Sequence, residues 1–410
     1  MGVLFPETVS AEKESLEAYQ RRGGYQALEK ARAELTPDGV LGLVEDAGLL
    51  GRGGAAFPTG KKWRFARQGA PPRYVVLNGG EDEPGSLKDR VLMEHHPHLV
   101  LEGMLLAAYA IEAEGAYLYV NHTYEASIAS LKSALTEAEA RGYAKIPFTV
   151  SPAPAEYVAG EDTAALEVIE GKKALPRKKP PYPTTAGIFG KPTVVNNVET
   201  FANVPAIVLK GAEWYRGIGR DGSHGTALFT LGAETNRPGV YELPFGTSLR
   251  HLIEGCGGGV KEGKRIKAIL PGGPSSAFLK PDQIDIPLDY ESLKRAGSAL
   301  GCGVVHLIPE GVCMVEELLR LAEFFAAECC GQCPACRMET GMLKNILEKV
   351  ERGEGSAELL PHIEKVVSFA KDKGFCSFIG MPGPPILSAL RLFPGDFQAH
   401  VRLKRCPYNT

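Results

Sequence analysis

The spacing of four cysteines is the feature of this sequence that most restricts its fold. Cys330, Cys333 and Cys336 form a C-x2-C-x2-C run, and Cys376 lies 40 residues after Cys336. Three closely spaced thiolates and a remote fourth suit a [4Fe–4S] cluster, because each of its four irons takes one thiolate. Zinc more often takes cysteines as two separated pairs, so zinc is the second interpretation and redox thiols are the third. A cluster requires the chain to reverse direction and return Cys376 to the short loop.

The other cysteines do not indicate a disulfide framework. Nine cysteines in 410 residues are too few for a disulfide scaffold, which argues against a secreted, disulfide-stapled fold. Cys329 is ambiguous, since it abuts Cys330 and could replace one of the four ligands. We interpret the remaining four as small buried core residues: Cys256, Cys302, Cys313 and Cys406.

The first half of the chain alternates strands and helices, which predicts a parallel sheet with helices on its faces. Ligands of such sheets bind beyond the carboxyl ends of the strands. The NGGEDEP motif, residues 78–84, directly follows the first strand and is expected there. The expected elements are a strand at 74–77, a helix at 99–111, a strand at 116–120, a helix at 124–141 and a strand at 148–151.

A glycine-rich loop, GRGGAAFPTG, occupies residues 51–60 and fits the pattern G-x-G-x-x-[GA]. The dinucleotide-binding version follows a strand, whereas the segment before this loop is predicted to be helical, so an ordinary Rossmann turn is not expected. Closely spaced glycines still let backbone N–H groups approach a phosphate or a flat ring. Lys61 and Lys62 follow and could neutralise a phosphate. The alternative is a mobile surface loop.

Polar motifs recur along the same region. YVAGEDT (157–163) places two acids after a glycine, and TVVNNVET (193–200) pairs two amides before a helical segment, where they can cap the helix or bind a phosphate. Each motif alone is also compatible with a purely structural role. Three histidines, His95, His96 and His98, are interpreted as helix-start or surface-loop residues rather than metal ligands.

The second half changes character. From Thr226 the pattern reads strand, turn, strand, a helix at 248–254 and a strand at 266–270, which resembles a small β-grasp module. From Met314 onward the periodicity is helical.

Charge and hydropathy exclude two classes of function. The formal net charge of −3 gives no electrostatic footprint for nucleic acid. The stretch Met1–Tyr19 has no apolar core, so no signal peptide is expected. The best membrane candidate is uncharged only from Gly103 to Ile111, whereas a spanning helix needs about 20 apolar residues. We expect a cytoplasmic chain that reaches the cytoplasmic face of a membrane only through a partner.

Taken in order, these motifs closely resemble the NADH-binding flavoprotein subunit of respiratory complex I. Its family includes the diaphorase subunits of NAD-linked hydrogenases and formate dehydrogenases. The resemblance extends from Arg21 to Cys376 and includes GRGGAAFPTGKKW, NGGEDEPGSLKDR, YVAGEDTAALEVIEGKKALPRKKPPYP, GIFGKPTVVNNVET, RPGVYELPFGT and CGQCPACR.

The resemblance implies an α/β multidomain fold that binds FMN, NADH and one [4Fe–4S] cluster. The implied parts are an N-terminal helical segment with the glycine-rich loop (1–60), a Rossmann-like FMN/NADH-binding domain (61–216), a β-grasp (ubiquitin-like) domain (217–310) and a helical bundle carrying the cluster (311–410). It also implies hydride transfer from NADH to FMN, followed by single-electron transfer to the cluster. No side chain is expected to act as a nucleophile or general base.

The resemblance also assigns the cofactor-binding residues. Around the FMN phosphate it places Gly51, Gly53, Gly54, Lys62, Asn196, Asn197 and Thr200. Around the flavin it places Asn78, Glu81, Tyr157, Gly160 and Glu161. Around the nicotinamide cofactor it places the aromatic residues Phe57, Phe65 and Tyr182 and the acids Glu83 and Asp162. The cluster ligands are Cys330, Cys333, Cys336 and Cys376.

Several positions depart from the usual pattern of the family. Ala56 stands where glycine is usual, Gly80 stands where an acid is usual, and Asp162 replaces glutamate. A shorter acid at position 162 could leave room for a 2′-phosphate, so the choice between NADH and NADPH stays open. Gly80 is the main support for one alternative, a non-catalytic cluster scaffold that has lost flavin or nucleotide binding.

The sequence carries one cluster motif and no second ferredoxin-like cysteine run, so electrons are expected to leave through other subunits. The resemblance points to a thioredoxin-like [2Fe–2S] subunit and a larger multi-cluster ferredoxin-like subunit. A further alternative keeps the diaphorase activity but places the chain in a soluble formate dehydrogenase or hydrogenase.

Overall fold

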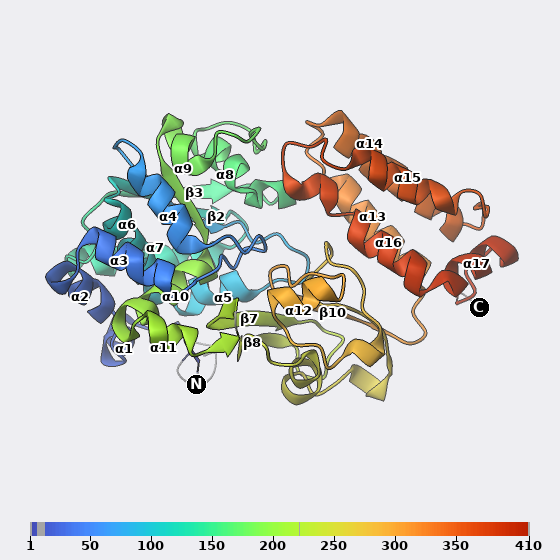
Figure 1. The fold of residues 1–410 in the computed structure, drawn as a ribbon, viewed down its shortest axis with the longest axis horizontal. Helices are drawn as coiled ribbons and strands as arrows, with labels where there is room; N and C mark the ends of the chain where they lie inside the picture. Colours follow the sequence, from blue (N-terminus) through green and yellow to red (C-terminus); the bar gives the residue numbers. More distant parts are fainter. Residues whose placement is uncertain (1, 6–12, 221, 409–410) are drawn as a thin grey trace. The chain divides into compact units, whose positions relative to one another are not determined.

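The computed structural model describes residues 2–5, 13–220 and 222–408 (Figure 1). These residues form two compact units. The first comprises the described residues within 1–82, 86–230 and 240–247, and the second those within 83–85, 231–239 and 248–410. The four-part division expected from the resemblance stays a prediction.

The first unit is built on a four-stranded parallel sheet with the order β3-β2-β1-β4. The inner strand β1 carries apolar residues on both of its faces. Val75 and Leu77 point into one buried cluster, and Val76 points into another on the opposite face. Burial on both faces is the rule for parallel sheets, because helices cover each side. The strands are β1 (Tyr74–Gly79), β2 (Gly115–Asn121), β3 (Phe148–Ala153) and β4 (Thr193–Asn197).

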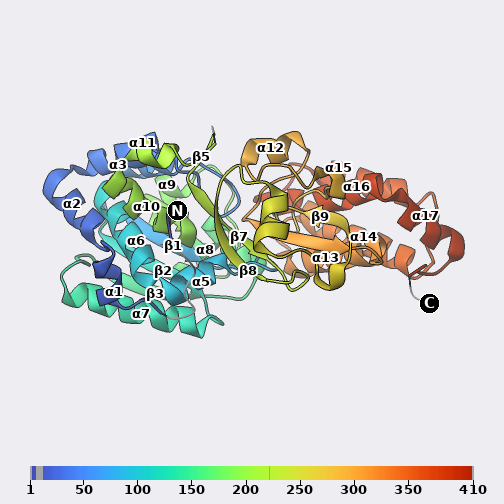
Figure 2. The ribbon, with the colours of Figure 1, turned by 90° about the horizontal axis from the view of Figure 1, so that it is seen from below.

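Helices cover the face of this sheet that carries the larger buried cluster. The most buried is α6 (Pro97–Ile111), which packs against α10 (Val198–Lys210) and α2 (Gln26–Glu34) (Figure 2). The backbones of α6 and α10 approach closely, since a Cβ at Gly103 would lie 1.9 Å from the Phe201 carbonyl oxygen. The other helices of the unit are α1 (Leu16–Arg21), α3 (Pro37–Asp46), α4 (Thr59–Gln68), α5 (Lys88–His95), α7 (Glu125–Ala140), α8 (Asp162–Ile169), α9 (Pro183–Ala186) and α11 (Ala212–Arg216).

The predicted α/β alternation is confirmed, with strand and helix ends shifted by a few residues. The sequence interpretation missed β4, because its five residues were assigned only as an amide motif before a helix. The histidines are also confirmed at helix ends: His95 ends α5, while His96 and His98 flank the proline that starts α6. Of the Met1–Tyr19 stretch, residue 1 and residues 6–12 lie outside the described part.

The segment after the first sheet contains the predicted strand–turn–strand. It forms β7 (Thr226–Leu231) and β8 (Gly239–Pro244), after the two-residue strands β5 (Gly219–Arg220) and β6 (Ser223–His224). The expected helix at 248–254 is present at residues 249–256, and its part His251–Cys256 is π-helical. The strand β9 (Ile266–Leu270) is where it was predicted, and it pairs antiparallel with β10 (Val304–Pro309). A short helix, α12 (Tyr290–Arg295), lies between them in the sequence.

The helical end of the second unit packs around α13 (Met314–Glu328) and α14 (Pro334–Glu351). Their apolar stripes meet in one cluster that includes Leu318, Leu343 and Leu347. The C-x2-C-x2-C run begins in the short connection between the two helices and ends in the first turn of α14. The remaining helices are α15 (Leu360–Ala370), α16 (Gly383–Leu392) and α17 (Pro394–Leu403).

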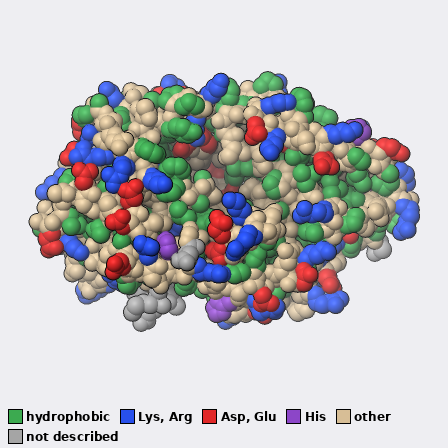
Figure 3. Space-filling model, in the orientation of Figure 1, with side chains coloured by type: hydrophobic (Ala, Val, Ile, Leu, Met, Phe, Trp, Pro, Cys, Tyr) green, Lys and Arg blue, Asp and Glu red, His purple; other side chains and the backbone are tan. Residues whose placement is uncertain are grey.

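Helix hydropathy and surface charge can also be described for this structure. Among the described residues, no helix is long and apolar enough to cross a membrane. On the face shown in Figure 3, basic and acidic side chains are interspersed.

Candidate functional site

The carboxyl edge of the parallel sheet gathers amide side chains. Asn78, at the end of β1, lies opposite Asn197, at the end of β4. Asn121 ends β2, and its side-chain nitrogen donates to an Asp82 oxygen at 2.5 Å. This is the edge at which ligands of parallel α/β sheets bind.

The glycine-rich loop is fastened to this edge. The Gly51 N–H donates to the Phe57 carbonyl at 2.9 Å, which closes the loop on itself. The Arg52 N–H donates to the Thr200 hydroxyl at 2.9 Å, and a Cβ at Gly53 would lie 3.3 Å from the Asn197 Cβ. The loop follows helix α3 rather than a strand, as predicted. Residues 51–54 are therefore held against the start of α10 rather than forming a loose surface loop.

Asn197 and Asn196 have different surroundings. The Asn197 side chain caps α10 by accepting the Glu199 N–H at 3.0 Å, as the motif predicted. The Asn196 side-chain oxygen accepts from the Trp63 indole at 3.0 Å in the interior. The structure thus uses Asn196 to join α4 to β4, and its contact with a cofactor stays a prediction.

A buried charge network lies beneath Asn197, and the sequence interpretation did not include it. The Lys88 ammonium lies 2.9 Å from Asp89 and 3.0 Å from Glu199, and it is 1% exposed. Asn197 donates to the second Asp89 oxygen at 2.6 Å. Burial raises the pKa of Glu199, although Lys88 and Arg52 oppose that rise. Lys88 and Asp89 are neighbours in the sequence, and only the fold brings Glu199 to them.

Glu81 is turned toward a helix rather than toward solvent. Its carboxylate accepts the N–H groups of Asp89 at 3.0 Å and Arg90 at 2.9 Å, together with the Ser86 hydroxyl, so it caps α5. Burial and the negative charge of Asp89 raise the pKa of Glu81 to about 7, although Lys88 and Ser86 oppose the rise.

Glu161 caps α8, and its other oxygen meets a lysine. One carboxylate oxygen accepts the Thr163 and Ala164 N–H groups at 2.8 and 2.9 Å. Lys179 bridges Glu161 and Asp162, at 2.6 Å from each. Burial opposes ionisation of Asp162, but the hydrogen bond from Glu161 and the charge of Lys179 outweigh it and lower its pKa. The structure therefore places one lysine against both predicted acids.

Asn78 and Gly160 also meet. The Asn78 side chain donates to the Gly160 carbonyl at 2.8 Å, and a Cβ at Gly160 would lie only 2.8 Å from the Gly80 carbonyl oxygen. The two glycines therefore allow a close backbone approach. Tyr157 begins the short 3-10 turn, Tyr157–Gly160, that carries Gly160 to this position.

Lys62 lies against strand β4, with a backbone carbonyl and the charge of Asp162 near its ammonium. Its ammonium donates to the Val195 carbonyl of β4 at 3.0 Å. Burial lowers the pKa of Lys62, while Asp162 opposes that change. A partly buried ammonium at this sheet, in the unit that also carries the glycine-rich loop, is suited to an anionic ligand.

Large aromatic side chains are exposed in the same unit. Phe57 is 44% exposed, Phe65 51% and Tyr182 58%, and these are the three aromatics that the resemblance assigned to the nicotinamide cofactor. The helices that carry or follow the last two, α4 and α9, pack against each other. Phe189, at 61%, is a fourth that the sequence interpretation missed. Exposed aromatic groups of this kind commonly mark a binding surface.

Glu83 belongs to the second unit, unlike the other predicted acids. Its carboxylate lies against Gly273, where an added Cβ would come within 2.5 Å of an oxygen. The placement of Glu83 at the nucleotide stays a prediction.

The cysteine loop lies against the segment that leads to Cys376. Cys329 and Cys336 have their sulfurs 3.6 Å apart, and the Phe375 N–H donates to the Cys333 sulfur at 3.3 Å. The segment before Cys376 therefore returns to the loop. Burial, Cys329 and Cys376 raise the pKa of the Cys336 thiol. Such thiols oppose one another's ionisation unless a cationic centre binds them, so the donor set fits an iron–sulfur cluster. The closeness of Cys329 leaves its role open.

Comparisons with known proteins agree with this geometry. A family model described as the Nuo51 FMN-binding domain matches residues 44–206, and one described as an SLBB domain matches residues 231–279. A third, the NADH-ubiquinone oxidoreductase-F iron-sulfur binding region, matches residues 316–400, which include the cysteine loop and Cys376. The resemblance, the fold class and the two predicted cofactors are confirmed by these matches.

Curated relatives match over nearly the whole chain. The second NADH-quinone oxidoreductase F subunit of Rhizobium meliloti (strain 1021) is 41% identical over 96% of this chain and 96% of that protein. The corresponding protein of Escherichia coli (strain K12) is 39% identical over 94% of this chain and 90% of that protein. A chain in the crystal structure of an NAD+-reducing [NiFe]-hydrogenase in the H2-reduced state superposes with a TM-score of 0.85. It is 34% identical, over 95% of this chain and 67% of that chain.

Proposed function

The chain belongs to the family of NADH-quinone oxidoreductase F subunits, and from this premise we propose that it is an NADH dehydrogenase (diaphorase) module. The module takes two electrons from NADH at a bound FMN and delivers them singly to a [4Fe–4S] cluster. The observation that carries the proposal is the glycine-rich loop fixed against α10, in the unit that also exposes Phe57, Phe65 and Tyr182.

The phosphate end of FMN is assigned to the loop and the start of α10. Gly51, Gly53 and Gly54 offer backbone N–H groups without a Cβ in the way. The start of α10 adds the positive end of a helix dipole, close to Thr200. Lys62 adds a positive charge that holds a phosphate at the same edge.

The flavin end is assigned to the backbone around Asn78, Gly160 and Tyr157. The contact between Asn78 and Gly160 holds two chain segments at a fixed separation next to the edge of the sheet. Bound there, FMN would accept a hydride as an electron pair and give up electrons one at a time. Glu81 and Glu161 contribute by fixing the starts of α5 and α8.

The nicotinamide cofactor is assigned to the exposed aromatics. Flat rings stack on aromatic side chains, and three are exposed in this unit: Phe57, Phe65 and Tyr182. Stacking aligns the nicotinamide for hydride transfer and keeps water from the reacting pair. The four cysteines, Cys330, Cys333, Cys336 and Cys376, hold the one-electron carrier.

The partners of the chain follow from its single cluster motif. We propose that electrons leave through a thioredoxin-like [2Fe–2S] subunit and a larger multi-cluster ferredoxin-like subunit, on the cytoplasmic side of a membrane complex. The similarity to a hydrogenase structure favours a second assembly, in which the same module serves a soluble hydrogenase or formate dehydrogenase.

An absorption spectrum of the anaerobically purified chain, before and after NADH, tests the function. We expect flavin bands that bleach on adding NADH. A cluster spectrum without flavin would instead support the non-catalytic scaffold. Repeating the titration with NADPH tests the nucleotide preference, and equal rates with both would support the extra room beside Asp162.

A matched pair of lysine variants tests the phosphate site. Lys62→Gln removes the charge beside β4, and we expect roughly tenfold or more loss of FMN affinity, as for loss of a charged hydrogen bond. Lys61→Gln changes the exposed neighbour and should retain FMN. Equal FMN retention in both variants would remove Lys62 from the site.

A further inference from the structure

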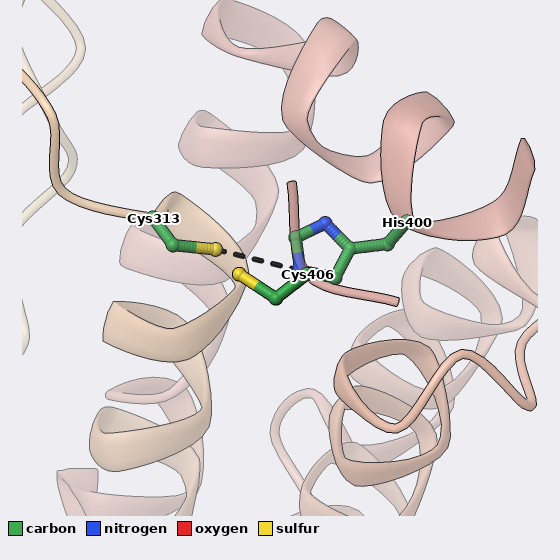
Figure 4. A group of neighbouring side chains, drawn as sticks. All are labelled: Cys313, His400 and Cys406. Atoms are coloured by element: carbon green, nitrogen blue, oxygen red, sulfur yellow. Dashed lines mark hydrogen bonds between the residues drawn. The ribbon is translucent and has the colours of Figure 1, made fainter. Parts of the chain in front are cut away.

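A second group of metal-ligating side chains lies in the second unit, apart from the cysteine loop. Cys313, His400 and Cys406 each offer one ligand atom, and these atoms all lie within 4.8 Å of one another (Figure 4). All three residues are buried, at 2%, 0% and 6% exposure. The sequence interpretation treated both cysteines as inert core residues, because free cysteine is commonly a small buried residue.

The histidine is oriented as a metal ligand. Its Nδ1 lies 2.8 Å from the Asp396 carbonyl oxygen, which can only accept, so Nδ1 must carry the proton. The unprotonated Nε2 then faces the Cys313 sulfur at 3.5 Å. A backbone carbonyl that fixes the far nitrogen in this way is the usual support of a zinc-bound histidine.

The spacing fits a tetrahedral ion. Zn–N and Zn–S bonds of about 2.0 and 2.3 Å give an N–S edge of about 3.5 Å in a tetrahedron. The separation of Nε2 and the Cys313 sulfur equals that edge. Two thiolates and one imidazole are a ligand set that favours zinc over hard cations such as Mg²⁺.

The supporting elements are fixed without a metal. Cys313 directly precedes α13, His400 lies on α17, and Cys406 follows α17. The Asp396 carboxylate, at the start of α17, binds Lys267 of β9 at 2.6 Å and the Met314 N–H at 3.0 Å. Those contacts hold α17 against α13 and occupy Asp396, so the three ligands meet in a preorganised site.

We propose that Cys313, His400 and Cys406 bind one Zn²⁺ ion, which fastens the segment after α17 to the start of α13. Binding releases one proton from each thiol and changes no oxidation state. A water molecule completes four-coordination. The ion has no part in electron transfer and is separate from the iron–sulfur cluster.

Metal analysis of the complete chain, purified without chelators from zinc-supplemented cells, tests the proposal. We expect one zinc per chain besides the iron. Zinc-edge X-ray absorption should then show two sulfur neighbours and lighter ligands in the remaining positions. Zinc surrounded by four sulfurs would overturn the proposal, since that ion would occupy the cysteine loop.

Variants separate the two metals. Cys313→Ser and His400→Asn should each lower zinc at least tenfold while iron stays unchanged. Cys376→Ser should lower iron and leave zinc unchanged. Cys256→Ser should change neither metal. A wild-type chain with less than one tenth of an equivalent of zinc, or with a Cys313–Cys406 disulfide, would disprove the site without any variant having to fold.

Discussion

At the scale of single residues, three polar side chains predicted to lie near the cofactor form hydrogen bonds with the starts of helices. Glu81, Glu161 and Asn197 each cap a helix, α5, α8 and α10 respectively. These helices begin where strands end, so their positive ends face the same edge. Three residues that we propose to lie around FMN thus also fix the starts of helices, whose positive ends suit an anionic group.

Ala56 is a residue whose backbone conformation suits glycine. Its φ of 52° lies in the left-handed region, which costs an ordinary residue about 1 kcal/mol. We expect Ala56→Gly to leave the thermal midpoint unchanged or raise it slightly, because the relieved strain offsets the greater chain entropy of glycine. Ala55→Gly, without a positive φ, should lower the midpoint. A larger fall in the thermal midpoint for Ala56→Gly than for Ala55→Gly would contradict this expectation.

Glu81 gives the first unit a defined pH dependence. Its pKa of about 7 in the folded chain exceeds the value of 4.5 for an unhindered glutamate, so the folded state binds the proton more tightly. Its contribution to stability is fully present below pH 4.5 and is lost as pH rises through about 7. The loss is at most on the order of 3 kcal/mol.

Urea unfolding between pH 4.5 and 8, compared with Glu81→Gln, measures this effect. We expect the difference in unfolding free energy between wild type and variant to fall as pH rises. A difference that is constant, or that grows with pH, would show that the Glu81 pKa is not raised.

At the scale of elements, the start of α10 combines a helix cap with buried charges. Asn197→Ala removes the cap and leaves Asp89 and Lys88 each without one partner, so we expect about 2 kcal/mol of lost stability together with weaker FMN retention. Thr36→Ala is the matched control, because Thr36 caps α3 through the Gly39 N–H. It should cost about 1 kcal/mol and leave FMN in place. Chemical denaturation and flavin content of both variants check the difference.

Hydrophobic periodicity and the order of the motifs predict most of the helices and strands, but they do not predict the buried charge network. The strands β1 and β2 are predictable because apolar runs end at polar turns. Strand β4 is harder, since its five residues include two asparagines that look like ligands. Lys88 and Asp89 are neighbours in the sequence, but Glu199 lies 110 residues after Asp89, and only the fold brings it to Lys88.

At the scale of the whole molecule, the two units should unfold separately. Both tryptophans, Trp63 and Trp214, lie in the first unit, so their fluorescence reports on that unit alone. The cluster ligands lie in the second, and the visible absorption of the cluster reports on it. We expect the two probes to give different urea midpoints and FMN to shift only the fluorescence transition. Coincident transitions, both shifted by FMN, would indicate one cooperative unit.

The first unit is closed by contacts that span most of its length. The Glu242 carboxylate accepts the N–H groups of Val3, Leu4 and Phe5 at 2.6, 2.9 and 3.0 Å. A ribosome adds about 5–20 residues per second, so on the order of ten seconds or more separates the synthesis of residue 3 from that of residue 242. During this interval the nascent chain holds an unfinished flavin domain. The contacts that close the first unit therefore cannot form until residue 242 has been made.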